Sequence, residues 1–288
     1  MEKVIFVSDM FAERYAGGAE LTTEALIEAC PFPFEKVECI SLTEEVIDNN
    51  PDSFWIFGNF ANLSTEAKAH FVKNEKYAVL EYDYKFCKYR NPSLHAITAS
   101  ECECETIFNA KLNSLFLHKA QSTWWMSQDQ KEIHTSKFSF LEKSNNIVLS
   151  SVFSESTLDA MENLDISKKN DKWIILNSSS PVKNSSGTVD YAKDNDMEYE
   201  LVWGLEHNEL LKKLAESKGL LFLPTGEDTC PRLVIEAKIL GCEVIMNENV
   251  QHRNEEWFQG DRESIISFLR ERPSVFWEEI EKNVEHSF

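Results

Sequence analysis

The sequence contains no apolar run that approaches the roughly 18 residues needed for a membrane-spanning helix. Its first residues carry an acidic side chain, Glu2, and lack the apolar centre of a secretory signal peptide. We therefore expect a soluble, cytoplasmic protein with no membrane span.

Positive charge is also scarce. The chain has 29 lysines and arginines against 49 aspartates and glutamates, which gives a formal net charge of −20. This balance disfavours a broad nucleic-acid-binding surface and an anionic membrane as partners, although a local basic groove is compatible with it.

The seven cysteines are odd in number, and in a reducing compartment they argue against a complete disulfide framework. Cys87, His95, Cys102 and Cys104 have the spacing C-x7-H-x6-C-x-C. Three thiolates and one imidazole complete a tetrahedral zinc site and leave no open position for substrate, so such a site would be structural. We predict a metal-stapled irregular loop over residues 84–105. The alternative is a chance cluster with His95 on a surface loop.

Hydrophobic residues make up 42% of the chain, enough for a substantial core, and 288 residues suggest about two domains. Short apolar strands alternate with amphipathic helices, which is typical of α/β proteins with parallel sheets. A charged stretch at 167–172 indicates a domain boundary. We expect two Rossmann-like domains, residues 1–166 and 167–288, with helices closing the C-terminal end. A single large α/β domain is the alternative.

Acidic residues follow the apolar strand that ends at Pro224. Glu227 and Asp228 lie in the next loop, and Pro231 opens a helix that contains Glu236. Both Asp228 and Glu236 could face the carboxyl edge of the sheet, where open α/β folds bind ligands. Carboxylates there can accept hydrogen bonds from sugar or ribose hydroxyls. The alternative is that the loop carboxylates only complement the helix N-terminus.

Two further loops could approach an anion. Gly17 and Gly18 precede a helix that starts near Glu20, so backbone amides could reach a phosphate there. Lys183 lies in a serine-rich loop between a strand and a helix, where it could neutralise a phosphate. An ordinary turn and a solvated lysine are the simpler interpretations.

The stretch D-TCPRLVI-E-AKILG-CEVI, residues 228–245, resembles the nucleotide-binding half of the retaining GT-B glycosyltransferases, the glycogen-synthase-like and sucrose-synthase-like group. The resemblance implies that Glu236 holds the ribose of a nucleotide. It also implies that Asp228 contacts the donor sugar where that group has glutamate, with Glu227 as a possible substitute.

The resemblance extends to the phosphate-binding parts of that group. Gly17, Gly18, Ala19 and Glu20 are similar to its Gly-Gly-Ala-Glu turn near the donor phosphates, and Lys183 falls where it has a phosphate-binding lysine. The arginine usually found a few residues earlier is absent, and Arg232 is the local candidate to replace its charge.

The resemblance implies that the chain moves a sugar from a nucleotide-sugar donor to an acceptor hydroxyl with retention. Positive groups would stabilise the leaving diphosphate, so no catalytic divalent metal is expected. The candidate catalytic residues are Asp228, Glu236 and Asp83. Asp83 ends an apolar strand near the group's usual His-Asp pair, with Tyr82 in place of the histidine. It is a candidate base or acceptor-positioning residue.

A basic cluster follows Asp83 in an otherwise acidic chain, formed by Lys85, Lys88 and Arg90. The alternative is that these residues form the solvated face of a loop. Two other functions stay open. One is a nonenzymatic nucleotide- or glycan-binding protein, because the group's arginine and first glutamate are missing. The other is a sugar transferase that acts on DNA bases, which the net charge of −20 disfavours.

Overall fold

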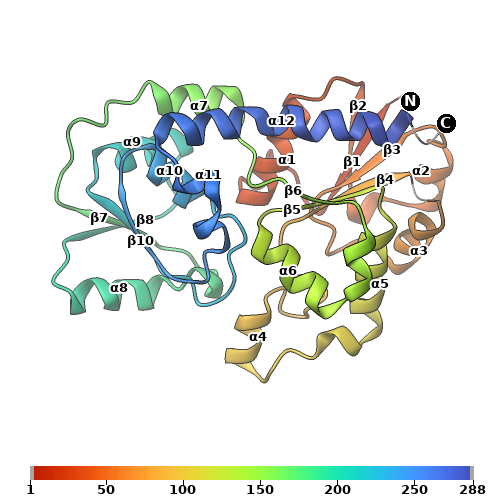
Figure 1. Cartoon of the computed structure of the whole chain (residues 1–288), viewed down its shortest axis with the longest axis horizontal. Helices are drawn as coiled ribbons and strands as arrows, with labels where there is room; N and C mark the ends of the chain where they lie inside the picture. Colours follow the sequence, from red (N-terminus) through yellow and green to blue (C-terminus); the bar gives the residue numbers. More distant parts are fainter. Residues whose placement is uncertain (1–2, 75, 286–288) are drawn as a thin grey trace.

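The computed structural model describes residues 3–74 and 76–285, which form two parallel β-sheets in two halves that lie side by side (Figure 1). The first sheet has six strands in the order β2-β1-β3-β4-β5-β6. Its strands are β1 Val4–Ser8, β2 Phe34–Glu38, β3 Phe54–Phe57, β4 Tyr77–Glu81, β5 Ser122–Trp125 and β6 Asn146–Val148.

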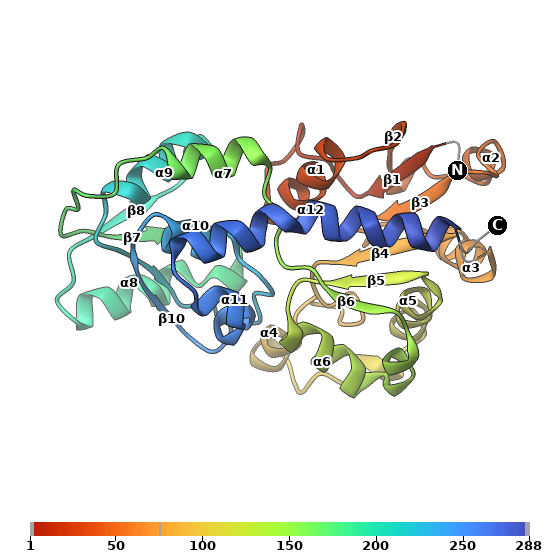
Figure 2. The ribbon, with the colours of Figure 1, turned by 45° about the horizontal axis from the view of Figure 1, so that its top comes forward.

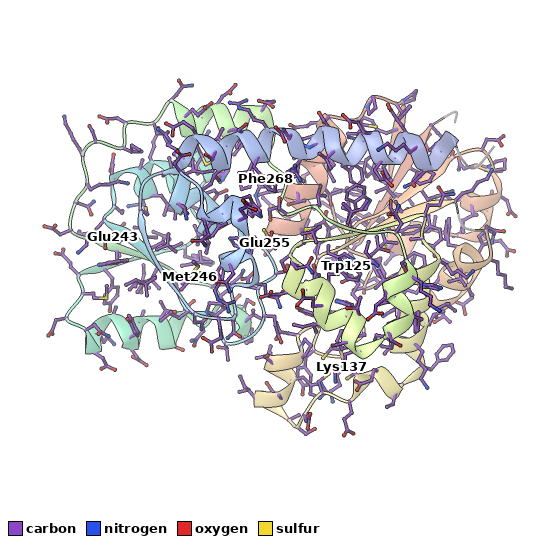
Figure 3. The ribbon with its side chains drawn as sticks, in the orientation of Figure 1. Trp125, Lys137, Glu243, Met246, Glu255 and Phe268 are labelled. Carbon is purple, nitrogen blue, oxygen red and sulfur yellow. The ribbon has the colours of Figure 1, made fainter. Side chains whose placement is uncertain are left out.

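The second sheet has four strands in the order β10-β9-β7-β8. Its strands are β7 Trp173–Leu176, β8 Tyr199–Val202, β9 Gly219–Phe222 and β10 Glu243–Met246. In Figure 3, Trp125 at the end of β5 lies in the first half, and Glu243 and Met246 at the two ends of β10 lie in the second. The predicted fold class, two Rossmann-like α/β halves, is confirmed.

Helices connect successive strands in both halves, as parallel pairing requires. The first half contains α1 Gly18–Glu28, α2 Glu44–Asp48, α3 Thr65–Asn74, α4 Pro92–Thr98, α5 Phe108–Lys119 and α6 Gln128–Lys137. The second contains α8 Ser185–Asp194, α9 His207–Glu216, α10 Arg232–Ile239 and α11 Glu256–Gln259, and α7 Glu155–Glu162 precedes its first strand. Short 3-10 turns are η1 Cys39–Ser41, η2 Cys104–Thr106, η3 Ser139–Lys143, η4 Pro181–Lys183 and η5 Gln251–Asn254.

The long C-terminal helix α12, Arg262–Glu285, begins in the second half and runs back along the first (Figure 2). Its Trp277 packs edge-on against Phe6 of β1 and donates a hydrogen bond from Nε1 to the Leu26 carbonyl at 3.0 Å. One apolar core extends from β1 through α12 to β9 and α10, and it therefore joins the two halves. Among the described residues, no helix combines the length and apolar composition that a membrane crossing requires.

Two local predictions differ from the structure. The apolar alternation in residues 36–42 predicts a strand there, but the strand β2 ends at Glu38 and the next residues form the turn η1. The loop 84–105 is not irregular throughout, because Pro92 begins the helix α4. Asn91 caps this helix by accepting a hydrogen bond at Oδ1 from the Leu94 amide at 2.9 Å. Proline is favoured at the first position of a helix because its missing N–H would lack a partner there anyway.

Candidate functional site

A cavity of about 560 Å³ lies where the carboxyl ends of the two sheets face each other. Tyr82 follows β4 and Met126 follows β5, while Leu176 and Phe222 end β7 and β9, and all four line the cavity. The carboxyl edge of a parallel sheet is where α/β folds place ligands, because the loops that follow the strands converge there. This cavity is therefore the candidate binding site.

The N-terminus of α1 reaches the cavity from the first half. Gly17 is the N-cap residue and makes no side-chain capping bond, and Gly18 is the first helical residue and a lining residue. A Cβ placed on Gly18 would contact the Arg232 side chain at 3.9 Å, so the helix N-terminus of one half lies against an arginine of the other. Unpaired amides at a helix N-terminus favour an anion.

Lys183 and Asp228, for which the resemblance implies contacts with donor phosphate and donor sugar, both line the cavity and bond to each other. Lys183 Nζ lies 2.5 Å from Asp228 Oδ2. Lys183 ends the turn η4 and comes before the left-handed residue Asn184, which turns the chain into α8. The backbone of Asp228 is fixed by its amide, which donates to the Asn249 carbonyl at 2.8 Å.

Glu236 and Arg232 lie one turn apart on α10 and both line the cavity. Glu236 is only 3% exposed, and its Oε1 lies 2.9 Å from His207 Nε2 and 4.0 Å from Arg232 Nε. His207 begins α9 after β8 and was not singled out in the sequence. The carboxylate is thus held between two nitrogen groups at the wall of the cavity.

Arg232 is 7% exposed, and its Nη1 donates to the Val152 carbonyl. Its guanidinium carbon lies 3.8 Å from the centre of the Phe153 ring. Within the described residues, Nε has no hydrogen-bond partner. Burial lowers the pKa of Arg232 below its ordinary value, although the charge of Glu236 opposes this. A buried guanidinium that is incompletely paired beside a cavity favours an anionic ligand.

Glu227 does not line this cavity, and its carboxylate is bonded on the other side of its loop. Ser93 donates to it twice, from Oγ to Oε1 at 2.6 Å and from the backbone amide to Oε2 at 3.0 Å. The side chains of these two adjacent residues therefore point to different parts of the structure. Asp228 belongs to the cavity, and Glu227 ties its loop to α4.

Asp83 also lies outside the cavity lining. Its carboxylate accepts from Arg90 Nε at 2.7 Å and from Lys85 Nζ at 3.2 Å. Burial opposes the charged form, but Lys85 and Arg90 hold the pKa of Asp83 below its usual range. An ion-paired carboxylate of lowered pKa accepts a proton less readily than an ordinary aspartate. Of the predicted basic cluster, Lys85 and Arg90 are therefore partners of Asp83.

The four predicted metal ligands come together beside this region. One donor atom from each of Cys87, His95, Cys102 and Cys104 lies within 4.8 Å of the others, and all four residues are buried. His95 Nδ1 is 3.4 Å from Cys87 Sγ and 3.6 Å from Cys104 Sγ. Three sulfurs and one imidazole nitrogen in this arrangement could hold a zinc ion.

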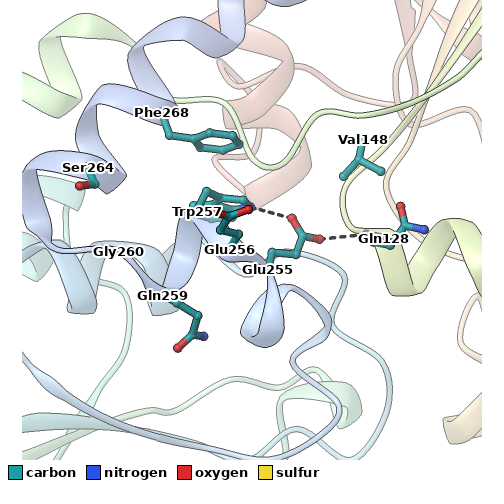
Figure 4. Close-up of a pocket in the computed structure, with 9 residues that line it drawn as sticks. All are labelled: Gln128, Val148, Glu255, Glu256, Trp257, Gln259, Gly260, Ser264 and Phe268. Carbon is teal, nitrogen blue, oxygen red and sulfur yellow. Dashed lines mark hydrogen bonds between the residues drawn. The ribbon is translucent and has the colours of Figure 1, made fainter.

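A second cavity, of about 850 Å³, lies between α6 and the segment that carries α11 and α12 (Figure 4). Glu255 accepts from the Gln128 amide at 2.9 Å and from Trp257 Nε1 at 2.6 Å, so it connects the two halves at this point. Trp257 stacks on Phe268 with ring centres 4.7 Å apart. None of the sequence-predicted site residues lines this cavity, which therefore is not the candidate site.

Sequence comparison with known families and with curated proteins finds no match. Solved structures do match over the whole chain. The Anabaena protein HepE in complex with UDP and glucose is 11% identical with a TM-score of 0.55, covering 100% of this chain and 96% of that one. A structure described as trehalose-6-phosphate from E. coli bound with UDP-2-fluoro glucose is 9% identical with a TM-score of 0.53, covering 99% and 97%.

A third match comes from a study of enzymatic glycosyl transfer with retention by trehalose-6-phosphate synthase. It is 7% identical with a TM-score of 0.51 and covers 100% of this chain and 97% of that one. The chain therefore has the fold of the GT-B glycosyltransferases, as the resemblance implied. At these identities the likeness concerns the fold.

Proposed function

We propose that this chain is a retaining glycosyltransferase that uses a nucleotide-sugar donor and an acceptor hydroxyl. The observation that carries the proposal is the convergence of Lys183, Asp228, Arg232 and Glu236 with the N-terminus of α1 around one cavity between the two sheets. The solved structures of the same fold that contain UDP or a UDP-sugar support UDP as the nucleotide to test first.

In this proposal each group acts through its charge and position. Glu236 accepts from the ribose hydroxyls, with His207 holding its carboxylate in place. Lys183, Arg232 and the amides of α1 surround the diphosphate and stabilise the charge that grows on it as the sugar leaves. Asp228 accepts from the hydroxyls of the donor sugar, whose ring becomes oxocarbenium-like while the acceptor hydroxyl attacks the same face.

The first half, residues 1–166, supplies the acceptor side in this proposal, together with the amides of α1 at the diphosphate, and residues 167–288 bind the rest of the donor. Asp83 does not line the cavity, so in this proposal it acts indirectly, by holding Lys85 and Arg90 on the acceptor side. Its ion pair with Arg90 makes it a poor proton acceptor. The proton of the acceptor hydroxyl therefore passes to the departing diphosphate oxygen, which carries the negative charge at that moment.

A donor panel tests the proposal. The protein is mixed with UDP-, GDP- and ADP-sugars, and both binding and release of nucleoside diphosphate are measured. We expect saturable binding of one nucleotide class and release of its diphosphate. Failure of every donor to bind would contradict the proposal.

A nonenzymatic binding protein is the second candidate, and the Lys183–Asp228 ion pair favours it. In this pair, the residue proposed to bind phosphate and the residue proposed to bind the sugar neutralise each other's charge. Saturable donor binding without release of nucleoside diphosphate, tested with several hydroxyl acceptors, would select this second function.

A further inference from the structure

We propose that Cys87, His95, Cys102 and Cys104 bind one zinc ion, and that the metal fixes the segment that grips the donor-side loop of the other half. The metal part of this proposal is independent of the transferase function. The effect on donor binding rests on the function proposed above.

The donor atoms fit the coordination geometry of zinc. With Zn–S near 2.3 Å and Zn–N near 2.1 Å, a tetrahedral site separates sulfur from nitrogen by about 3.6 Å. His95 Nδ1 lies 3.4 Å and 3.6 Å from two of the sulfurs. The three cysteines are free of disulfides and buried together, so their sulfurs and the imidazole nitrogen can all face one cation. A closed set of four protein ligands indicates a structural ion.

Two of the metal ligands flank, in sequence, the residues that bond to the other half of the protein. Asn91 and Ser93 lie between Cys87 and His95 in the chain. The Asn91 carbonyl accepts from the His95 amide at 3.0 Å, and Cys87 Sγ lies 3.6 Å from the same oxygen. Anchoring Cys87 and His95 to one ion therefore restrains the backbone that presents Asn91 and Ser93.

These two residues grip the loop that precedes α10. Asn91 Nδ2 donates to the Glu227 carbonyl at 2.7 Å, and Ser93 donates to the Glu227 carboxylate. Gly226 is the residue that permits this approach, because a Cβ there would overlap the Asn91 side chain. We call the contacts of Asn91 and Ser93 with Glu227 the latch.

The latch acts on the cavity through the next residue. Asp228 follows Glu227 and pairs with Lys183 at the cavity wall, and Thr229 Oγ1 donates to the Tyr82 carbonyl at 2.9 Å. A loop held at Glu227 and Thr229 presents Asp228 in one position. Loss of the metal should release one of these two anchors and leave Asp228 less well placed, although no metal ligand lines the cavity.

Metal analysis of the full chain, purified in reducing buffer without chelator, tests the site itself. We expect about one zinc per chain in the parent, and loss of zinc in Cys104→Ser and His95→Ala. The matched control Cys30→Ser, a cysteine outside the cluster, should keep its zinc. Absence of zinc from the parent, or an unchanged zinc content in Cys104→Ser, would overturn the site whether or not any nucleotide binds.

Hydrogen exchange of the segment 226–229 tests the latch without relying on activity. Ser93→Ala and Glu227→Gln leave all four metal ligands intact, so both variants should keep zinc and fold. We expect their exchange in this segment to rise by about tenfold, because Ser93→Ala removes the hydroxyl donor and Glu227→Gln removes the charge of the acceptor. Ser156→Ala, an exposed serine on α7, is the control and should exchange as the parent does.

A measurement of donor binding distinguishes the zinc and latch proposal from the transferase proposal. If the parent binds a nucleotide-sugar, Glu227→Gln should raise the donor Kd severalfold while leaving zinc content unchanged. Unchanged exchange in Ser93→Ala and Glu227→Gln would overturn the latch. Zinc and latch results as predicted, with no donor bound by the parent, would instead contradict the transferase proposal alone.

Discussion

Lys183 Nζ and Asp228 Oδ2 lie 2.5 Å apart, across 45 residues of sequence, at the wall of the cavity between the two sheets. A bound donor would have to compete with this ion pair for both side chains. A diphosphate would compete with Asp228 for the lysine, and sugar hydroxyls would compete with the lysine for Asp228. In the proposed function, the pair would therefore link the binding of phosphate to the placement of the Asp228 carboxylate against the donor sugar.

Asp228→Asn should separate transfer from binding. Removal of the carboxylate frees Lys183, so UDP should bind as tightly as to the parent or more tightly. Transfer should fall strongly, because sugar contacts that strengthen in the oxocarbenium-like state contribute to rate. Calorimetry with UDP and turnover of the accepted UDP-sugar measure the two effects. Asp190→Asn, an exposed aspartate on α8, is the control. Transfer by Asp228→Asn at the parent rate would remove Asp228 from the site.

Lys183→Ala should weaken binding of a nucleoside diphosphate much more than binding of the nucleoside. A hydrogen bond to a charged group contributes about 1.5–3 kcal/mol, which corresponds to a Kd change of about tenfold or more. The comparison is UDP against uridine in the parent and the variant. Lys193→Ala, on the exposed face of α8, should bind both as the parent does. Equal losses for UDP and uridine would show that Lys183 is not a phosphate ligand.

Trp277→Ala should destabilise the protein because α12 holds the two halves together through this side chain. Trp277 is 4% exposed and bonds to Leu26 of α1. Truncation of a buried tryptophan costs about 3–5 kcal/mol of unfolding free energy. Trp203→Ala is the matched control, since that side chain is 74% exposed and its loss should change stability by less than about 0.5 kcal/mol. Denaturant unfolding measures both, and similar values for the two variants would contradict the role of α12.

His252→Phe should make the protein less sensitive to acid. Burial lowers the pKa of His252 from 6.5 to about 3, and the charge of Lys238 acts in the same direction. The unfolded chain therefore binds a proton below pH 6.5 that the folded chain does not bind until about pH 3. The parent loses stability over that interval as pH falls, and the variant lacks this contribution.

The difference in unfolding free energy between His252→Phe and the parent should rise by about 1.4 kcal/mol per pH unit below 6.5. Phenylalanine suits the site because the imidazole stacks on Trp257, and neither ring nitrogen has a hydrogen-bond partner in the described part of the chain. Denaturant unfolding of both proteins from pH 7.5 to pH 4.5 provides the comparison. Parallel stability curves would contradict the shifted pKa.

The architecture was predictable because it depends on local pattern. Short apolar runs alternate with amphipathic helices, and the runs at 3–8 and 219–224 each contain a strand of the structure. The cysteine and histidine cluster was also visible, because its four members lie within eighteen residues of each other. Sequence spacing predicts that two residues lie close in space when the chain between them is too short to separate them far.

Pairings between distant residues were not predictable in this way. The attachment of Glu227 to Ser93 spans 134 residues, and the contact of His207 with Glu236 depends on how α9 and α10 pack. No periodicity in the sequence indicates which of the adjacent residues Glu227 and Asp228 faces the cavity. That choice is made by the position of α4, an element that the sequence pattern presented as loop.

A binding titration of Glu236→Ala against the parent with UDP, uridine and UDP-sugars tests whether this cavity holds a nucleotide donor. Glu209→Gln, an exposed acidic residue on α9, is the control. Because Glu236 is proposed to hold the ribose, we expect that the parent binds and that Glu236→Ala loses about tenfold or more in affinity for UDP and uridine alike. Absence of nucleotide binding in the parent, or equal affinity in Glu236→Ala, would contradict a donor site in this cavity.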